Sequence, residues 1–281
     1  MFFPHRPVGA PNAAQVRFVQ AVEAYRPDVL VLDQNLISTE WFLEKHLHHF
    51  PNVTFPGKLL WPSRSDGYNL QEFLDSNIKR FRIFVFPWFK EPSPLSAYAL
   101  VPFGYCQEIL PCASKGRCDA PKADVITRWG KSAAEHFPKP TQVFLQPASK
   151  YPNWQWEGFY RTFYADAVMR YAKFALDHKQ AISGAARLAA QWYEELLALD
   201  ASAASDPSVI DDNRLLLKSH IMQLRRNRGV ACYFIVGDGD ASYKSCVIQE
   251  LTLYLKFLES EPSSANEADK QQMVSIMQAM K

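Results

Sequence analysis

The first third of the chain alternates short apolar runs with polar turns. The run Val29–Leu32 is continuous, as in a strand buried on both faces, and it stops at the polar triplet Asp33-Gln34-Asn35. The pair Ser38-Thr39 then offers an N-cap for a helix that Pro51 ends. The segment Val53–Phe55 is a second short apolar stretch. The pattern predicts a strand, a polar turn, a helix and a second strand.

A further helix and strand continue this pattern. Asn69 is a candidate N-cap, and Glu72 stands three residues later, as in a capping box. Phe81–Phe86 is a third apolar run, and a short strand is expected near Tyr98–Val101. Strands that alternate with helices favour parallel pairing through right-handed crossovers. The sequence therefore predicts an α/β domain with a small parallel, Rossmann-like sheet.

From Trp154 onward, helical periodicity replaces the short runs. A spacing of roughly 34 residues per helix pair is typical of tetratricopeptide-type arrays, and Gly229 to Pro262 fits one such repeat. We expect an α/β domain over residues 1–150, followed by an all-α, tetratricopeptide-like domain over residues 151–281. The predicted helices are Asp124–Ala134, Phe159–Asp177, Gly184–Leu199, Val209–Arg225, Arg228–Val236, Tyr243–Glu259 and Glu267–Met280.

Composition narrows the class of protein. The 281 residues are 48% hydrophobic, which suits a globular core, and the net charge of +2 gives no electrostatic case for nucleic acid. The apolar runs fall far short of the about 20 residues that a spanning helix needs. The first ten residues, with prolines at 4 and 7, make a poor strand and a poor signal peptide. We therefore expect the α/β domain to be truncated at its N-terminus.

The polar triplet Asp33-Gln34-Asn35 is the first candidate site. In open α/β sheets, ligands bind outside the carboxyl ends of the strands, which is where this triplet is predicted to lie. Glu40 and Trp41, at the start of the next helix, extend the set of candidate ligand-binding residues. The alternative is that Asp and Asn simply stabilise a turn.

Histidines at 46, 48 and 49 raise the question of a metal. His46 and His49 share a helical face, but no third ligand is visible in the sequence, and histidines favour the last turn of a helix because of its dipole. We expect no metal site and no cofactor.

The segment Gly237–Asp240 follows an apolar stretch and precedes a helix, as a phosphate-binding loop does. Its lysine is misplaced for a P-loop, however, and two aspartates would repel phosphate. A turn between two helices of a repeat is the preferred interpretation. The sequence also lacks the G-x-S-x-G and H-E-x-x-H motifs, although catalytic groups can converge from distant positions.

The chain resembles a known family, the IPT-domain-directed protein O-mannosyltransferases, which are multi-pass enzymes of the secretory pathway. The resemblance covers most of the chain and is strongest up to about Pro111. It rests on Arg26-Pro27-Asp28, Asp33-Gln34, Trp41-Phe42-Leu43, Phe50-Pro51-Asn52-Val53-Thr54-Phe55-Pro56-Gly57, Tyr68-Asn69-Leu70, Phe73-Leu74 and Val101-Pro102-Phe103-Gly104-Tyr105-Cys106.

The resemblance implies a role without catalysis by this chain alone. The family's catalysis is attributed to its membrane-embedded half, and no residue here matches a family catalytic motif. The chain would be the soluble C-terminal region on the lumenal side of the endoplasmic reticulum, with Met1 not the natural start. It would help to hold or orient acceptor protein domains, alongside the membrane-embedded half. The rival hypothesis is a freestanding α/β enzyme with its site at Asp33-Gln34-Asn35.

A lumenal location would permit two covalent modifications of this chain, a disulfide and an asparagine-linked glycan. Cys112 and Cys118 lie in one polar loop, and that location would favour a disulfide between them, whereas free thiols are the alternative. Asn52-Val53-Thr54 is an N-glycosylation sequon, which matters only in the secretory pathway.

Helical repeats commonly bind proteins on a concave face, and aromatic side chains are enriched at binding hot spots. At helical spacing, most aromatics pack in the core, and any left exposed would be the binding anchors. The aromatics considered are Tyr160, Tyr164, Tyr171, Trp192 and Tyr193.

Overall fold

The computed structural model describes residues 2–4, 28–86, 97–112, 121–137, 156–204, 218–260 and 267–280. Its contacts divide the chain into two compact units, Met1–Val125 and Ile126–Lys281, which we call the α/β unit and the helical unit. The predicted boundary near residue 150 lies outside the described residues and stays a prediction. In outline, the mixed α/β region followed by a mostly helical half is confirmed.

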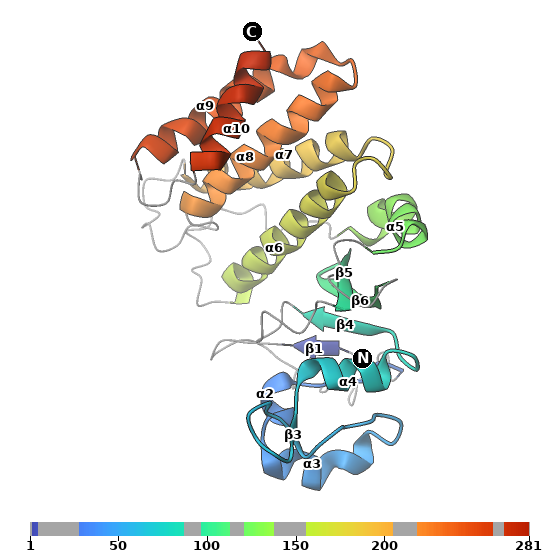
Figure 1. Ribbon diagram of the computed structural model, residues 1–281. Coiled ribbons are helices and arrows are strands. Elements are labelled where there is room, and N and C mark those ends of the chain that lie inside the picture. The colour runs from blue at the N-terminus through green and yellow to red at the C-terminus, as the bar shows by residue number, and fades with distance from the viewer. Residues whose placement is uncertain are drawn as a thin grey trace. The chain divides into compact units, whose positions relative to one another are not determined.

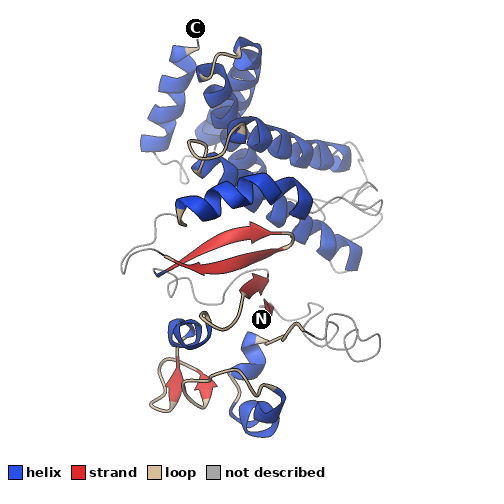
Figure 2. Ribbon diagram, turned by 90° about the vertical axis from the view of Figure 1, so that its right-hand side faces the viewer, coloured by secondary structure: helices blue, strands red, loops and turns tan. Residues whose placement is uncertain are grey.

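The larger sheet of the α/β unit is mixed rather than parallel. Its order is β1-β4-β6-β5, and only the β1–β4 pair is parallel. The strands β5 and β6 form an antiparallel hairpin (Figure 2), in which Gly104 takes a left-handed φ of 57°. A two-residue turn can join only antiparallel strands, so the hairpin rules out an all-parallel sheet. The strands are β1 (Phe2–Pro4), β4 (Ile83–Phe86), β5 (Tyr98–Phe103) and β6 (Cys106–Pro111).

Three sequence expectations about strands are corrected here. The run Val29–Leu32 is not a strand: Val31 forms a single β-bridge, although Val31 and Leu32 are both buried. Val53–Phe55 is also irregular. Conversely, Phe2–Pro4 does form a strand, at the sheet edge where proline is tolerated. Apolar runs predicted burial correctly, but burial does not require strand pairing.

The helices of the α/β unit follow the predicted caps. Thr39 occupies the N-cap position of α3, but its hydroxyl donates to the Leu36 carbonyl and makes no capping bond. Asn69 caps α4 through the predicted capping box. In that box, the Glu72 N–H donates to Asn69 Oδ1 and the Asn69 N–H to Glu72 Oε2, both at 2.8 Å. The elements are α2 (Gln34–Ile37), α3 (Glu40–His46), η1 (Leu47–His49), β2 (Leu59–Leu60), β3 (Gly67–Tyr68) and α4 (Leu70–Asn77), with β2 and β3 parallel.

One hydrophobic core joins these pieces. Figures 1 and 2 show α2, α3, α4 and the small β2–β3 sheet on the β1–β4 side of the larger sheet. Ile83 and Val85 of β4 are fully buried in one cluster with Phe73 and Leu74 of α4. Leu32, from the irregular run before α2, is also fully buried in this cluster. The core therefore fixes the position of the polar triplet that follows Leu32.

The helical unit is a succession of helices, each packed on the next in sequence from α6 to α10 (Figure 1). The break at Gly237–Asp240 is a turn between helices, as preferred above: Cys232–Val236 is helical, and Gly239 takes a φ of 103°. The helices are α5 (Ala123–His136), α6 (Trp156–Asp177), α7 (Ala185–Ala204), α8 (Lys218–Gly237), η6 (Ala241–Tyr243), α9 (Lys244–Ser260) and α10 (Glu267–Ala279).

One helical prediction needs correction. Val209–Arg225 and Arg228–Val236 were expected as separate helices, but α8 runs without a break through Arg226 and Asn227. The residues before Lys218 lie outside the described part of the chain. Within α8, Gly229 lies against α9, where a Cβ would collide with the side chain of Leu251. Gly229 thus permits close helix packing rather than ending a helix.

Candidate functional site

Asp33 acts locally as a helix cap. Its side chain is the N-cap of α2, where Oδ1 accepts the Asn35 backbone N–H at 2.8 Å, and its carbonyl accepts the Ile37 N–H at 3.0 Å. The residue is 7% exposed. Aspartate is among the best N-caps because its oxygen satisfies an otherwise unpaired helical N–H. The geometry therefore supports the turn-forming role of this side chain.

The other two members of the triplet differ from Asp33 in their environment. Gln34 is 2% exposed and buried in α2, whereas Asn35 is exposed to solvent. The triplet thus combines one buried cap, one buried amide and one solvent-exposed amide. Because Val29–Leu32 is not a strand, the argument from the carboxyl end of a parallel strand no longer applies. Ligand binding by the triplet stays a prediction.

Glu40 and Trp41 lie in the first turn of α3 and reach solvent. Trp41 is 51% exposed, and Lys45 lies 6.0 Å from the centre of its ring. Glu40 Oε2 accepts a hydrogen bond from Arg64 Nη1 at 3.1 Å. This ion pair fastens the start of α3 to the loop between β2 and β3, which holds a second exposed tryptophan, Trp61.

Trp61 was not singled out from the sequence, and it is 50% exposed. Several hydrogen bonds join the residues of its loop. The Arg64 N–H donates to the Trp61 carbonyl at 3.1 Å, and the Trp61 Nε1–H donates to Ser63 Oγ at 2.6 Å. Gly67 closes the loop, because a Cβ there would collide with the Trp61 carbonyl oxygen. The only sequence signal for exposure is that Trp61 directly precedes Pro62–Gly67, a segment rich in the turn-forming residues Pro, Ser, Asp and Gly.

Arg64 completes the charged frame of this loop. Its guanidinium donates two parallel hydrogen bonds of 2.9 Å to the Asp66 carboxylate, in the bidentate arrangement that arginine favours. These bonds lower the pKa of Asp66 and keep it charged. We call Trp41, Trp61, Glu40, Arg64 and Asp66 the tryptophan region. It offers two large exposed aromatic side chains beside a network of exposed ion pairs.

Four of the five aromatic residues considered in the helical unit pack in its core, as expected for most of them. Tyr164, Tyr171, Trp192 and Tyr193 are each no more than 8% exposed, and Tyr164 donates a hydrogen bond to Glu195 of α7. The side chain of Tyr160 lies outside the described part of the structure. Core packing, the commoner fate of aromatics at helical spacing, therefore accounts for these four residues.

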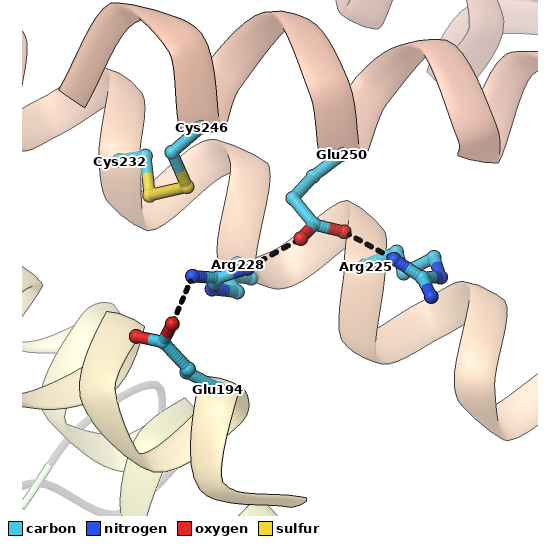
Figure 3. Close-up of a disulfide and its surroundings, with 6 residues drawn as sticks. All are labelled: Glu194, Arg225, Arg228, Cys232, Cys246 and Glu250. Carbon is cyan, nitrogen blue, oxygen red and sulfur yellow. Dashed lines mark hydrogen bonds and ion pairs between the residues drawn. A yellow bond between two sulfur atoms is a disulfide. The ribbon is translucent and has the colours of Figure 1, made fainter. Parts of the chain in front are cut away.

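The helical unit contains a buried charge cluster and a disulfide that were missed from the sequence (Figure 3). Glu250 of α9 is 1% exposed and accepts hydrogen bonds from Arg225, at 2.9 Å, and from Arg228, both on α8. One helical turn away, Cys232 and Cys246 join the same two helices with a Cα–Cα distance of 6.2 Å. Residues 14 apart in sequence give no local signal of such pairing.

Two predicted features remain, the pair Cys112 and Cys118 and the cluster of histidines. Cys112 is disulfide-bonded, but Cys118 lies outside the described residues, so the Cys112–Cys118 pair stays a prediction. The rings of His46 and His49 stack at 5.7 Å. A search of the described residues finds no group of three His, Cys, Asp or Glu side chains placed to hold a metal ion.

Comparison with known proteins connects part of the chain to one enzyme class. The chain is 30% identical over 161 residues to "Protein O-mannosyl-transferase tmem260" of Dictyostelium discoideum. It is 35% identical over 104 residues to "Protein O-mannosyl-transferase TMEM260" of Mus musculus. These matches cover 57% and 34% of the chain, but only 19% and 15% of the relatives. No protein-family model and no solved structure matches the chain.

The similarity establishes a distant relation to protein O-mannosyl-transferases over part of this chain. Among the described residues, none of the helices is both long enough and apolar enough to cross a membrane. The Cys232–Cys246 disulfide is typical of proteins that fold in oxidising compartments outside the cytosol.

Proposed function

We propose that this chain serves protein O-mannosylation by binding and orienting acceptor protein domains, and that it does not transfer mannose by itself. The observation that carries the proposal is the partial similarity to two protein O-mannosyl-transferases. In this proposal the chain acts on the lumenal side of the endoplasmic reticulum, beside a membrane-embedded catalytic part. The disulfide supports the location, because that compartment permits disulfide formation.

The tryptophan region is the surface that we propose for the acceptor. Tryptophan, tyrosine and arginine are enriched at binding hot spots, and tryptophan buries a large contact area at a low cost in conformational entropy. Trp41 and Trp61 are both about half exposed, and the Arg64 ion pairs fix the loop and helix that hold them. A surface that is rigid before binding loses less entropy when the partner docks.

The helical unit has a supporting role in this proposal. Its described aromatics Tyr164, Tyr171, Trp192 and Tyr193 stabilise the core, and we propose that its consecutive helices form a tetratricopeptide-like support. No observation favours the rival hypothesis of a freestanding enzyme at Asp33-Gln34-Asn35, since Asp33 is occupied as a helix cap.

A mannose-transfer assay tests whether the chain binds the acceptor without transferring mannose itself. Purified chain, incubated with dolichyl-phosphate mannose and an acceptor domain, is expected to transfer no mannose. Added in excess to the mouse relative and the same acceptor, it should lower the transfer rate by competing for acceptor. The double variant Trp41→Ala/Trp61→Ala should fail to compete, whereas Ile248→Ala, an exposed apolar residue of α9, should compete as the wild type does. Turnover by the chain alone, or equal competition by all variants, would refute the proposal.

A further inference from the structure

The sequence contains one N-x-[ST] motif, Asn52-Val53-Thr54. It lies directly after η1, in a turn that the Val53 N–H closes by donating to the Phe50 carbonyl at 3.0 Å. Pro51 and Asn52 occupy the centre of this turn, and both are exposed, whereas Val53 is buried. A group attached to the Asn52 amide would therefore extend into solvent without displacing any part of the core.

The folded chain holds the third residue of the motif by its backbone and its side chain. The Thr54 N–H donates to Asn77 Oδ1 at 2.9 Å, and Asn77 Nδ2 donates to the Thr54 carbonyl at 2.8 Å. The Thr54 hydroxyl accepts a hydrogen bond from Arg80 Nη2. A glycosylating enzyme reads the hydroxyl of this third residue, which in the folded chain is already bound. The motif is thus accessible to such an enzyme before α4 packs against it.

The compartment is supported independently. The Cys232–Cys246 disulfide lies in the helical unit and shares no residue with the motif. Disulfides form in the secretory pathway, which is where asparagine-linked glycans are also attached. The disulfide therefore supports folding in the secretory pathway, where the exposed motif can be glycosylated.

We propose that Asn52 carries an asparagine-linked glycan, added before the segment from Thr54 to Arg80 folds. In this step the Asn52 Nδ2 atom bonds to the anomeric carbon of the reducing-end sugar of a lipid-pyrophosphate-linked oligosaccharide. The bond from that carbon to the phosphate oxygen breaks, the lipid pyrophosphate leaves with the electron pair, and the amide nitrogen loses one proton. This inference concerns a modification and does not depend on the acceptor-binding role proposed above.

The modification is tested by directing the full chain into the endoplasmic reticulum of cultured cells with an added signal sequence. Wild-type protein should carry one glycan, and peptide N-glycosidase should remove it in one step and leave aspartate at position 52. Asn52→Gln and Thr54→Ala should lack the glycan, whereas Thr54→Ser keeps the motif and should retain it. Limited proteolysis of the α/β unit, which contains Asn52 and Thr54, shows whether each variant has folded. Folded wild-type protein without a glycan would overturn the proposal.

The timing has its own test. Unglycosylated chain made in bacteria is offered to the purified oligosaccharide-transferring enzyme and its lipid-linked donor, either folded or reduced and unfolded. The unfolded chain should be modified at Asn52 several times faster than the folded chain. Equal rates for the two forms would contradict the claim that modification precedes folding.

Discussion

Asn77 binds three backbone groups with one side chain. Its Oδ1 accepts the Thr54 N–H, and its Nδ2 donates to the carbonyls of Thr54 and Phe73 at 2.8 Å. The residue is fully buried at the end of α4. It therefore fixes an irregular segment that has no strand partner, and it does so with both amide N–H donors and the carbonyl oxygen of its side chain.

We expect Asn77→Ala to lower the free energy of unfolding of the α/β unit by about 2–4 kcal/mol, because three hydrogen bonds are lost from a buried site. Urea denaturation of the full chain, followed by hydrogen exchange of the Thr54 amide, measures the effect. The neighbouring variant Ser76→Ala removes only a bond to its own helix and should change stability by less than about 0.5 kcal/mol. Equal stability of the two variants would show that the three hydrogen bonds of the Asn77 side chain do not stabilise the fold.

At the residue scale, hydrogen bonds between residues close in sequence were predictable, and those between residues far apart in sequence were not. The Asn69–Glu72 capping box was predicted because both residues lie within one helical turn. The Asn77–Thr54 bonds span 23 residues, and Arg225–Glu250 spans 25, so no local pattern announces them. The candidate site shows the same division: the exposure of Trp61 depends on a loop closed by Gly67 and by the Arg64 ion pairs.

At the scale of elements, the disulfide determines how firmly α8 and α9 are joined. Changing both Cys232 and Cys246 to serine should lower the free energy of unfolding of the helical unit by about 3 kcal/mol, the entropic estimate for a loop of about 15 residues. The urea midpoint of the oxidised wild type should fall to that of the variant when a reductant is added. A midpoint that does not respond to reductant would contradict the bridge.

The junction of α8, α9 and α10 is predicted to be sensitive to pH. Arg226 Nε donates to both carboxylate oxygens of Asp269 at 2.9 Å, and the Tyr254 hydroxyl donates to the same carboxylate at 2.7 Å. The hydrogen bonds from Arg226 lower the pKa of Asp269 in the folded chain, despite its partial burial. Partial burial and the bond to Asp269 raise the pKa of Tyr254 to about 12.

Because the folded pKa of Asp269 is depressed, its contribution to stability is complete above the ordinary aspartate value of about 3.9. That contribution is lost as the pH falls through the lowered folded pKa. The stability difference between wild type and Asp269→Asn should therefore be largest near neutral pH and should shrink toward pH 2. Denaturation curves over this range measure it, and a difference that is constant with pH would exclude the linkage.

The sequence predicted helices well where the helical pattern of apolar residues extended over several turns. It predicted strands less well from apolar runs of only a few residues. The helices α4 to α7, α9 and α10 overlap the predicted segments, because an amphipathic or buried helix repeats its signal over several turns. A four-residue apolar run such as Val29–Leu32 indicates burial only, and here the chain is buried without a strand partner. Of the two strands of the β5–β6 hairpin, only the first was predicted, near Tyr98–Val101. The turn at Gly104 joins it to β6, and the two strands are antiparallel.

For the molecule as a whole, we propose that the α/β unit binds the acceptor and that the helical unit supports it. The four described aromatics considered as anchors in the helical unit are buried, whereas Trp41 and Trp61 of the α/β unit reach solvent on a frame held by ion pairs. The relation to protein O-mannosyl-transferases is the reason that we propose the acceptor protein as the partner of this surface.

The most direct test of this account is the affinity of the full chain for an acceptor domain, measured by isothermal titration calorimetry. Wild type and Ile248→Ala are expected to bind equally, and Trp41→Ala/Trp61→Ala should bind at least about tenfold more weakly, since each hot-spot tryptophan contributes more than 1 kcal/mol. Circular dichroism should show all three proteins to be equally folded. Unchanged affinity in the double tryptophan variant, or no binding by the wild type, would contradict the proposed function.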